Sequence, residues 1–432
     1  MADAVSPLVA LRHRNFRLLW SGQFVSVSGT MMQSAAILWH VSLLVASDRR
    51  ALALGLVGLV RVVPVIAFSM MSGVVADVLD RRRLMLVTQS AMALLAAMLA
   101  WLTFRGLQTV WPIYALAAVS SAAGAFDLPA RQSLIPNLVP REHLANAISL
   151  NTIVFQAASV TGPSLAGLAI AGLGVGWVYA INAASFLAVI LALILMRGVP
   201  SVPGKEGQRS EVSLRAAAEG LRFVFSSPMI RSTMLLDFLA TFFSSATALL
   251  PIFAQDILRV GAKGYGWLYA APSAGALVAS LGMVRFVDRL DRRGPVLLWS
   301  IVVYGLATAV FGISRSFSLT FLCLALTGGS DTVSTVLRNL IRQLETPDHL
   351  RGRMTGVNMV FFMGGPQLGE LEAGTVANWF GAPFSVVSGG LGCLAATAWI
   401  AGKTPALRHY RRTPHEVPIT RSGESRRVAS NE

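Results

Sequence analysis

Twelve long runs of apolar residues follow one another along the chain, and short polar segments rich in arginine separate them. Most runs hold about the 20 residues that a helix needs to cross the roughly 30 Å hydrocarbon core of a bilayer. Because lipid offers the backbone no hydrogen-bond partners, each run is predicted to form a helix. In the first half the predicted helices cover residues 17–45, 52–76, 84–104, 110–126, 144–173 and 176–196. In the second half they cover residues 229–253, 265–286, 295–313, 317–336, 354–379 and 382–401.

This pattern predicts an all-α integral membrane protein with twelve transmembrane helices in two pseudo-symmetric six-helix halves. The predicted divisions are a polar N-terminus (1–16), a first half (17–198), a linker (199–228), a second half (229–402) and a polar tail (403–432). Within the linker, residues 213–225 place their large apolar side chains on one helical face, which predicts an amphipathic helix at the membrane interface. The tail has almost no apolar pattern and is predicted to be disordered.

Composition agrees with this class and excludes others. The chain is 54% hydrophobic and 13% charged, which is too apolar for a soluble domain. Its two cysteines, Cys323 and Cys393, lie inside apolar runs, so neither a disulfide framework nor a thiolate metal site is expected. The sequence has no G-x-x-x-x-G-K-[ST] phosphate loop and no H-E-x-x-H pair. We therefore expect no enzymatic activity, no cofactor and no metal.

The positions of the basic residues predict the orientation. Most of the 36 fall in the termini and in alternate loops, all on one side of the predicted membrane. Basic loops stay cytoplasmic, so both termini are predicted to lie in the cytoplasm and the protein in the inner (plasma) membrane. The net charge of +15 has the same explanation, and no nucleic-acid partner is expected.

Two polar hairpins share the pattern D-x-L-D-R-R, at residues 77–82 and 288–293. Each hairpin joins the second and third predicted helices of its half. Their equivalent positions, half a chain apart, indicate an internal duplication. Further echoes support it, such as Asp127 and Arg131 in the first half against Asp331 and Arg338 in the second.

Six-plus-six helices with G-x-x-x-D-x-x-x-R-R at residues 73–82 resemble the major facilitator superfamily. Within it, the segment P-A-R-Q-S-L-I-P-N-L-V-P at 129–140 and the Gly-Pro pairs resemble the enterobactin-exporter and macrolide-efflux branch. The pairs are Gly162-Pro163 and Gly365-Pro366, expected to bend their helices. Val78 departs from the family, which usually has a basic residue there.

The resemblance implies that the hairpins form a cytoplasmic gate. In the family the aspartate bonds across the seam between the halves, and the arginines brace the cytoplasmic side when it is closed. The residues that match are Gly73, Asp77, Arg81, Arg82, Asp288, Arg289 and Arg292. A simpler interpretation remains open, in which the hairpins are only a positive-inside signal.

Four ionisable residues lie inside predicted helices: Arg61, Asp237, Glu370 and Glu372. An ionised side chain at mid-bilayer costs at least about 2.5–3.5 kcal/mol, so each is a candidate for substrate or proton binding. Asp237 is the preferred proton-coupling candidate, because its counterpart in the first half is the amide Gln23. The alternative is an acid near the cytoplasmic interface.

Arg61 and Glu370 are predicted to lie at equal depth on neighbouring helices, below the external surface. They are therefore predicted to form an ion pair that closes that side, with Glu372 a less suitable partner. Alternatively, Arg61 lines the cavity and attracts an anionic substrate.

Together these features predict a secondary transporter that exports small amphiphilic compounds, drug-like or siderophore-like, by alternating access and proton antiport. Its expected partners are a small-molecule substrate, protons and the lipid bilayer, and it is expected to be a monomer. Uptake of a metabolite or phospholipid-like solute is the alternative. A membrane sensor without transport is a remote one.

Overall fold

The computed structural model describes residues 8–198, 221–347 and 350–412. Within these ranges the description leaves out the side chains of residues 69–70, 73–74, 76–78, 288, 352–353, 356, 359–360 and 363.

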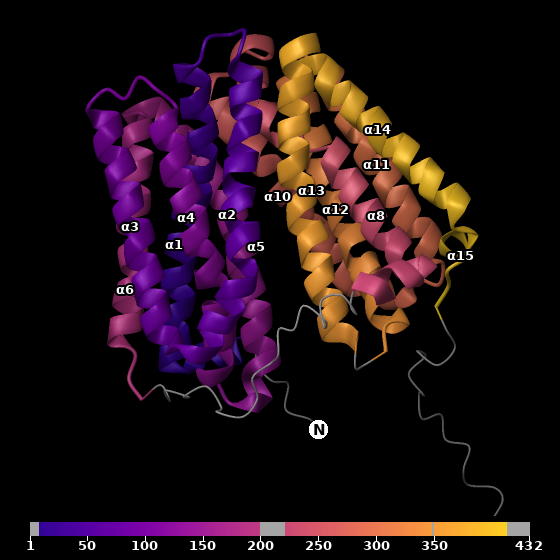
Figure 1. The fold of residues 1–432 in the computed structure, drawn as a ribbon, viewed down its shortest axis with the longest axis horizontal. Coiled ribbons are helices and arrows are strands. Elements are labelled where there is room, and N and C mark those ends of the chain that lie inside the picture. The colour runs from indigo at the N-terminus through magenta and orange to yellow at the C-terminus, as the bar shows by residue number, and fades with distance from the viewer. Residues whose placement is uncertain (1–7, 199–220, 348–349, 413–432) are drawn as a thin grey trace, which may run out of the picture.

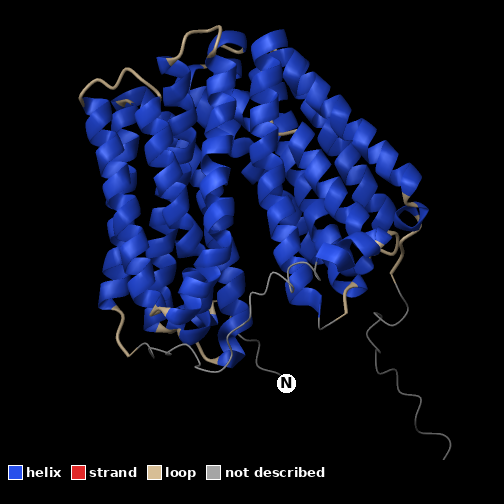
Figure 2. Ribbon diagram, viewed as in Figure 1, coloured by secondary structure: helices blue, strands red, loops and turns tan. Residues whose placement is uncertain are grey.

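Every secondary-structure element of the described chain is a helix, and no strand occurs in these ranges (Figure 2). The predicted all-α membrane fold is confirmed. In the first half the long helices are α1 (Arg14–Leu44), α2 (Arg50–Val78), α3 (Arg81–Phe104), α4 (Trp111–Leu134), α5 (Leu144–Leu173) and α6 (Val175–Leu195). In the second half they are α8 (Pro228–Phe243), α10 (Gly261–Phe286), α11 (Arg293–Ile313), α12 (Phe317–Glu345), α13 (Arg351–Phe380) and α14 (Ala382–Lys403). Short turns extend α8 through α9 (Leu250–Ile252) and η5 (Phe253–Ile257).

Ten helical segments of the described chain are long and apolar enough to cross a membrane. They include all the long helices except α1 and α13, which have the length but carry more polar side chains. The count of twelve spanning helices is therefore confirmed for ten and stays a prediction for these two.

Equivalent turns in the two halves have a glycine with the same backbone conformation. Gly174 joins α5 to α6 with φ 91°, and Gly381 joins α13 to α14 with φ 88°. Both values lie in the left-handed region that glycine adopts without a Cβ clash. The internal duplication thus extends to the backbone of the last turn in each half.

The two halves meet at one end of the bundle and diverge toward the other (Figure 1). We call the end where α1 begins and α14 ends the terminal end, and the opposite end the distal end. One apolar cluster at the distal end contains residues of both halves, such as Leu38 and Phe253. Toward the terminal end each half has an apolar cluster of its own, around Leu134 in the first and Leu337 in the second.

Glycines allow the helices of opposite halves to touch at the distal end. A Cβ on Gly374 of α13 would lie 2.7 Å from Cα of Gly55 in α2, and a Cβ on Gly266 of α10 would lie 2.7 Å from Cα of Gly167 in α5. A side chain at these positions would force the helices apart. The α2–α13 and α5–α10 pairs therefore form the seam between the halves.

Polar contacts also link the halves at the distal end. Arg50 Nη1 donates to Asp256 Oδ2 over 2.9 Å, and Gln255 Nε2 donates to Ser42 Oγ over 2.7 Å. Deeper in the bundle, the Tyr265 hydroxyl donates to the Ala35 carbonyl over 2.8 Å. The structure is therefore the arrangement in which the distal end is closed.

Two predictions about the polar segments are wrong. Helix α12 continues past residue 336 to Glu345, because its last turns are amphipathic and fall outside an apolar window. Arg338 and Arg342 are thus buried helix residues and not loop residues. The start of the tail is ordered: α15 (Pro405–Arg408) buries Leu407 and follows α14 closely.

The linker between the halves and the two ends of the chain are only partly described. Most of the predicted amphipathic helix at 213–225 lies outside the described residues. Its described end, together with residue 226, is helical (221–226). Residues 1–7 and 413–432 also lie outside the described residues. The predicted divisions of the chain therefore stay predictions.

Candidate functional site

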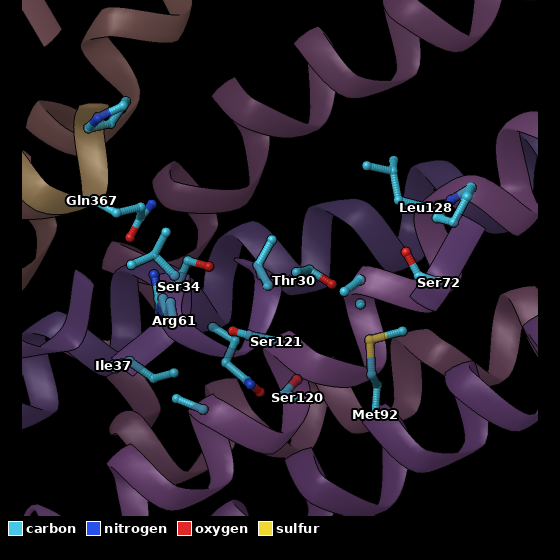
Figure 3. Close-up of a pocket in the computed structure, with 18 of the residues that line it drawn as sticks. Thr30, Ser34, Ile37, Arg61, Ser72, Met92, Ser120, Ser121, Leu128 and Gln367 are labelled. Carbon is cyan, nitrogen blue, oxygen red and sulfur yellow. The ribbon is translucent and has the colours of Figure 1, made fainter. Parts of the chain in front are cut away.

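A cavity of about 670 Å³ lies between α1, α2, α3, α4 and α13 (Figure 3). Hydroxyl and amide side chains such as Ser34, Ser121 and Gln367 share its wall with apolar ones such as Met92 and Phe362. This volume and this mixture of surfaces are typical of sites for drug-sized ligands. The cavity can therefore hold an amphiphilic molecule of that size.

Arg61 is the charged side chain among the described residues that line the cavity. Figure 3 shows it at the same end as Ser34 and Gln367, away from Leu128 and Ser72. A guanidinium presents five hydrogen-bond donors and a fixed positive charge. Arg61 thus lines the cavity, as the alternative interpretation predicted. Its attraction of an anionic substrate stays a prediction.

Glu370 lies in the α2–α13 seam, beside the cavity. A Cβ on Gly58 would lie 2.7 Å from Glu370 Oε2, so the carboxylate rests against α2 one turn from Arg61. Arg61 and Glu370 are close enough to interact electrostatically, but no direct salt bridge joins them. The predicted proximity of the two is present, whereas the predicted ion pair is not formed in this arrangement. Glu372 is half-buried.

Asp237 lies in a buried charge cluster outside the cavity. Arg338 Nη2 approaches Asp237 Oδ1 at 2.9 Å, and Arg342 Nη2 approaches Oδ2 at 3.8 Å. Arg338 also contacts Asp331 at 3.4 Å. Two acids and two arginines balance in charge and link α8 to α12. This geometry favours a structural role for Asp237, and its role in proton coupling stays a prediction.

The first half has a smaller cluster at the equivalent place. Asp127 of α4 is buried, pairs with Arg131 one turn later, and accepts hydrogen bonds from Thr88 and Gln89 of α3 at 3.0 Å each. The sequence echo between the halves identified Asp127, Arg131, Asp331 and Arg338, but not their contacts. Arg342 was missed because it was assigned to a loop.

The first hairpin binds the ends of neighbouring helices. Arg81 donates to the Ser133 carbonyl of α4 over 3.0 Å, and Arg82 donates to the Ile194 carbonyl of α6 over 3.2 Å. Asp80 caps α3 by accepting from the Arg83 amide over 2.9 Å. Arginines at such positions satisfy the last carbonyls of a helix. In this arrangement the described hairpin contacts stay within the first half.

For the remaining residues of the predicted gate, the structure describes no contact across the seam between the halves. Arg289 and Arg292 of the second hairpin are exposed. The side chains at Gly73, Asp77 and Asp288 lie outside the described residues. The gate therefore stays a prediction.

Each Gly-Pro pair sits where its helix presses against another. A Cβ on Gly162 of α5 would lie 2.7 Å from the Ser28 carbonyl of α1, and one on Gly365 of α13 would lie 2.4 Å from Thr241 Oγ1 of α8. Pro366 lines the cavity, and its carbonyl accepts a hydrogen bond from Ser245 over 2.8 Å. The glycines thus allow close approach in equivalent places of both halves.

Among the residues that the structure describes, no three His, Cys, Asp or Glu side chains are grouped as a metal site would require.

Gly124 offers a way to narrow the cavity. It lines the cavity on α4, and a Cβ there would meet nothing within 4 Å. Gly124→Leu should fold normally, with a gain of up to about 1 kcal/mol in helix propensity, and should weaken the binding of bulky ligands. Thermal melting and ligand titration measure the two effects. Gly282→Leu is the matched control, because Gly282 also faces open space but does not line the cavity. Equal effects of the two variants on binding would contradict this position for the site.

Comparison with known proteins agrees with the fold. Residues 5–415 match the family model described as transmembrane secretion effector. The chain is 27% identical over 420 residues to the enterobactin exporter EntS of Escherichia coli strain K12 and to that of Shigella dysenteriae serotype 1. Each match covers 95% of this chain and 96% of the relative.

Solved transporters share the fold at low identity. A POT family transporter in complex with 5-aminolevulinic acid matches with a TM-score of 0.72 at 11% identity, covering 91% of this chain and 96% of that one. A bacterial homologue of the lysosomal transporter Spinster, in an inward-facing and unoccupied conformation, matches with a TM-score of 0.71 at 14% identity, covering 93% and 99%. At these identities the likeness concerns the fold alone.

Proposed function

Because the chain belongs to the transmembrane secretion effectors of the major facilitator superfamily, we propose that it exports small amphiphilic compounds from the cell by alternating access. The protein acts as a monomer in the inner membrane, and proton antiport drives export. The likeness to enterobactin exporters favours siderophore-like substrates within this class.

The observation that carries the proposal is the cavity between the helices, with Arg61 in its wall. A single cation among amides, hydroxyls and apolar groups fits an amphiphile with an anionic or strongly hydrogen-bond-accepting head. Charge-assisted hydrogen bonds to a guanidinium are stronger than neutral ones, so the head binds at Arg61. The rest of the molecule packs against the apolar wall.

The arginine-rich loops support cytoplasmic termini, since basic loops remain on that side. The terminal end is then cytoplasmic and the distal end external. With the distal end closed, the halves diverge toward the cytoplasm, which is the arrangement that loads an exported substrate. Opening of the α2–α13 and α5–α10 contacts releases it outside.

A panel of ligands tests the substrate class. Siderophores, macrolides, cationic dyes and phospholipid-like solutes are added to the detergent-solubilised protein, and the thermal midpoint is measured. Anionic amphiphiles should stabilise the parent by mass action, and should stabilise Gly124→Leu less. If only cationic dyes stabilise the parent, or if Gly124→Leu responds as strongly as the parent, the proposed site is wrong.

A further inference from the structure

Glu370 is an ionisable group in the part of the structure that must come apart when the distal end opens. Its carbonyl oxygen would lie 2.7 Å from a Cβ on Gly55, and its Oε2 would lie 2.7 Å from a Cβ on Gly58. Both its backbone and its carboxylate therefore rest against α2. No other ionisable residue on α13 is described in such contact with the opposite half.

The groups around Glu370 leave its charge without a direct partner in the described part of the seam. From α2 the nearest cation is Arg61, which interacts electrostatically but forms no salt bridge. From α10 the phenols of Tyr265 and Tyr269 lie within electrostatic range. The hydroxyl of Tyr265 is already bonded to the Ala35 carbonyl.

The other helices packed on α13 present no titratable group to this turn in the described chain. Segment α8 and the turn after it face α13 through Thr241, Phe242 and Ser245, which contact Gly365 and Gly369. From α14, Ser385 donates to the Ala373 carbonyl over 2.8 Å. The buried acid of α8, Asp237, is engaged with Arg338.

We infer that Glu370 is a proton-binding site whose occupancy controls the closed seam at the distal end. Glu370 is half-buried in the seam, and partial removal from water without a direct partner disfavours an ionised carboxylate, whereas a protonated carboxyl is neutral and costs much less. Protonated Glu370 therefore stabilises the closed seam. Ionised Glu370 favours separation of α2 from α13, which exposes the carboxylate to water.

This inference rests on the proposed function and specifies its coupling step. When the distal end is open, Glu370 takes a proton from the water outside, and the distal end closes. The proton then leaves through the cavity. The cavity wall includes Gln367, one turn before Glu370 on α13, and Arg61, one turn after Gly58 on α2. Loss of the proton favours reopening at the distal end. The direction of proton movement is that of an antiport exporter.

The experiment measures the conformation without any substrate, so its result does not depend on whether export is correct. Spin labels are attached at exposed distal positions of the two halves, Gln108→Cys and Ser318→Cys. The native cysteines, Cys323 and Cys393, are buried and are replaced by alanine. Double electron–electron resonance then measures the distribution of distances between the two spin labels from about pH 5 to about pH 9. This range covers the pKa values of buried carboxyls.

In the parent, the ratio of closed to open distal ends should fall with rising pH, by up to about tenfold per pH unit in the linked range. Glu370→Gln, which mimics the protonated side chain, should stay closed throughout. Glu370→Asp keeps an ionisable group and should keep a pH response. Glu372→Gln is the matched control on the same helix and should behave as the parent.

A parent that shows no pH response overturns the inference. So does a Glu370→Gln variant that responds as the parent does, or a Glu372→Gln variant that loses the response equally. If Glu370→Gln yields too little folded protein, the pH midpoint of the response decides: a proton site at residue 370 requires that Glu370→Asp shift this midpoint while Glu372→Gln leaves it at the parent's value, and an unshifted midpoint in Glu370→Asp overturns the inference. A failed export assay with an intact, Glu370-dependent response would refute the function and leave the proton site standing.

Discussion

Asp237→Asn should destabilise the protein more than any neutralisation at its surface. The side chains of Asp237, Arg338 and Arg342 are each 1–2% exposed. Removing the acid leaves one uncompensated positive charge in a buried cluster. Breaking one side of a buried pair in this way costs about 3–5 kcal/mol. Thermal melting in detergent measures the loss.

The double variant Asp237→Asn/Arg342→Gln tests whether charge balance is the cause. It restores an equal number of acids and arginines, with Arg338 still beside Asp331 at 3.4 Å. Its stability should therefore be closer to the parent than that of the single variant. Asp48→Asn is the control, because Asp48 and its partner Arg49 are 70% and 83% exposed, and such pairs contribute little. Additive losses in the double variant would contradict the charge-balance account.

Arg61→Gln should abolish transport of anionic amphiphiles while leaving the fold intact. Glutamine keeps two donors but not the charge, and a hydrogen bond to a charged group contributes about 1.5–3 kcal/mol. Affinity for the panel compound that most stabilises the parent should therefore fall about tenfold to a hundredfold. Ligand titration by intrinsic fluorescence measures it, and thermal melting confirms folding.

Arg105→Gln is the matched control for Arg61→Gln. Arg105 is exposed at the distal end, where its guanidinium lies 5.5 Å from the centroid of the Trp101 ring. Its loss changes the net charge equally but should not alter binding. Unchanged affinity in Arg61→Gln, or an equal loss in Arg105→Gln, would show that Arg61 does not hold the substrate.

Helix periodicity and depth were sufficient to predict that Arg61 and Glu370 lie near each other, because both lie a similar number of residues from the distal ends of adjacent helices. The family resemblance supplied the adjacency of α2 and α13. Neither could give the rotamers, and so the direct ion pair was predicted although the side chains interact only at longer range. Side-chain contacts depend on close packing that sequence spacing does not encode.

The charge cluster around Asp237 shows where the prediction of helix ends from runs of apolar residues fails. Arg338 and Arg342 follow the apolar part of α12, so they were counted as loop residues that mark the cytoplasmic side. Their burial depends on Asp237 of α8, roughly a hundred residues earlier in the chain. The ordered start of the tail was missed for a similar reason, because Leu407 alone carries most of its apolar signal.

Accumulation in membrane vesicles tests the central claim of proton-driven export most directly. Everted vesicles that contain the parent protein are given an acidic interior and the best ligand of the panel, and right-side-out vesicles are given an acidic exterior and the same ligand. The account predicts accumulation in the everted vesicles, lost when the pH gradient is collapsed and lost in the Arg61→Gln variant. Accumulation driven by the gradient in right-side-out vesicles only would show uptake and contradict the account.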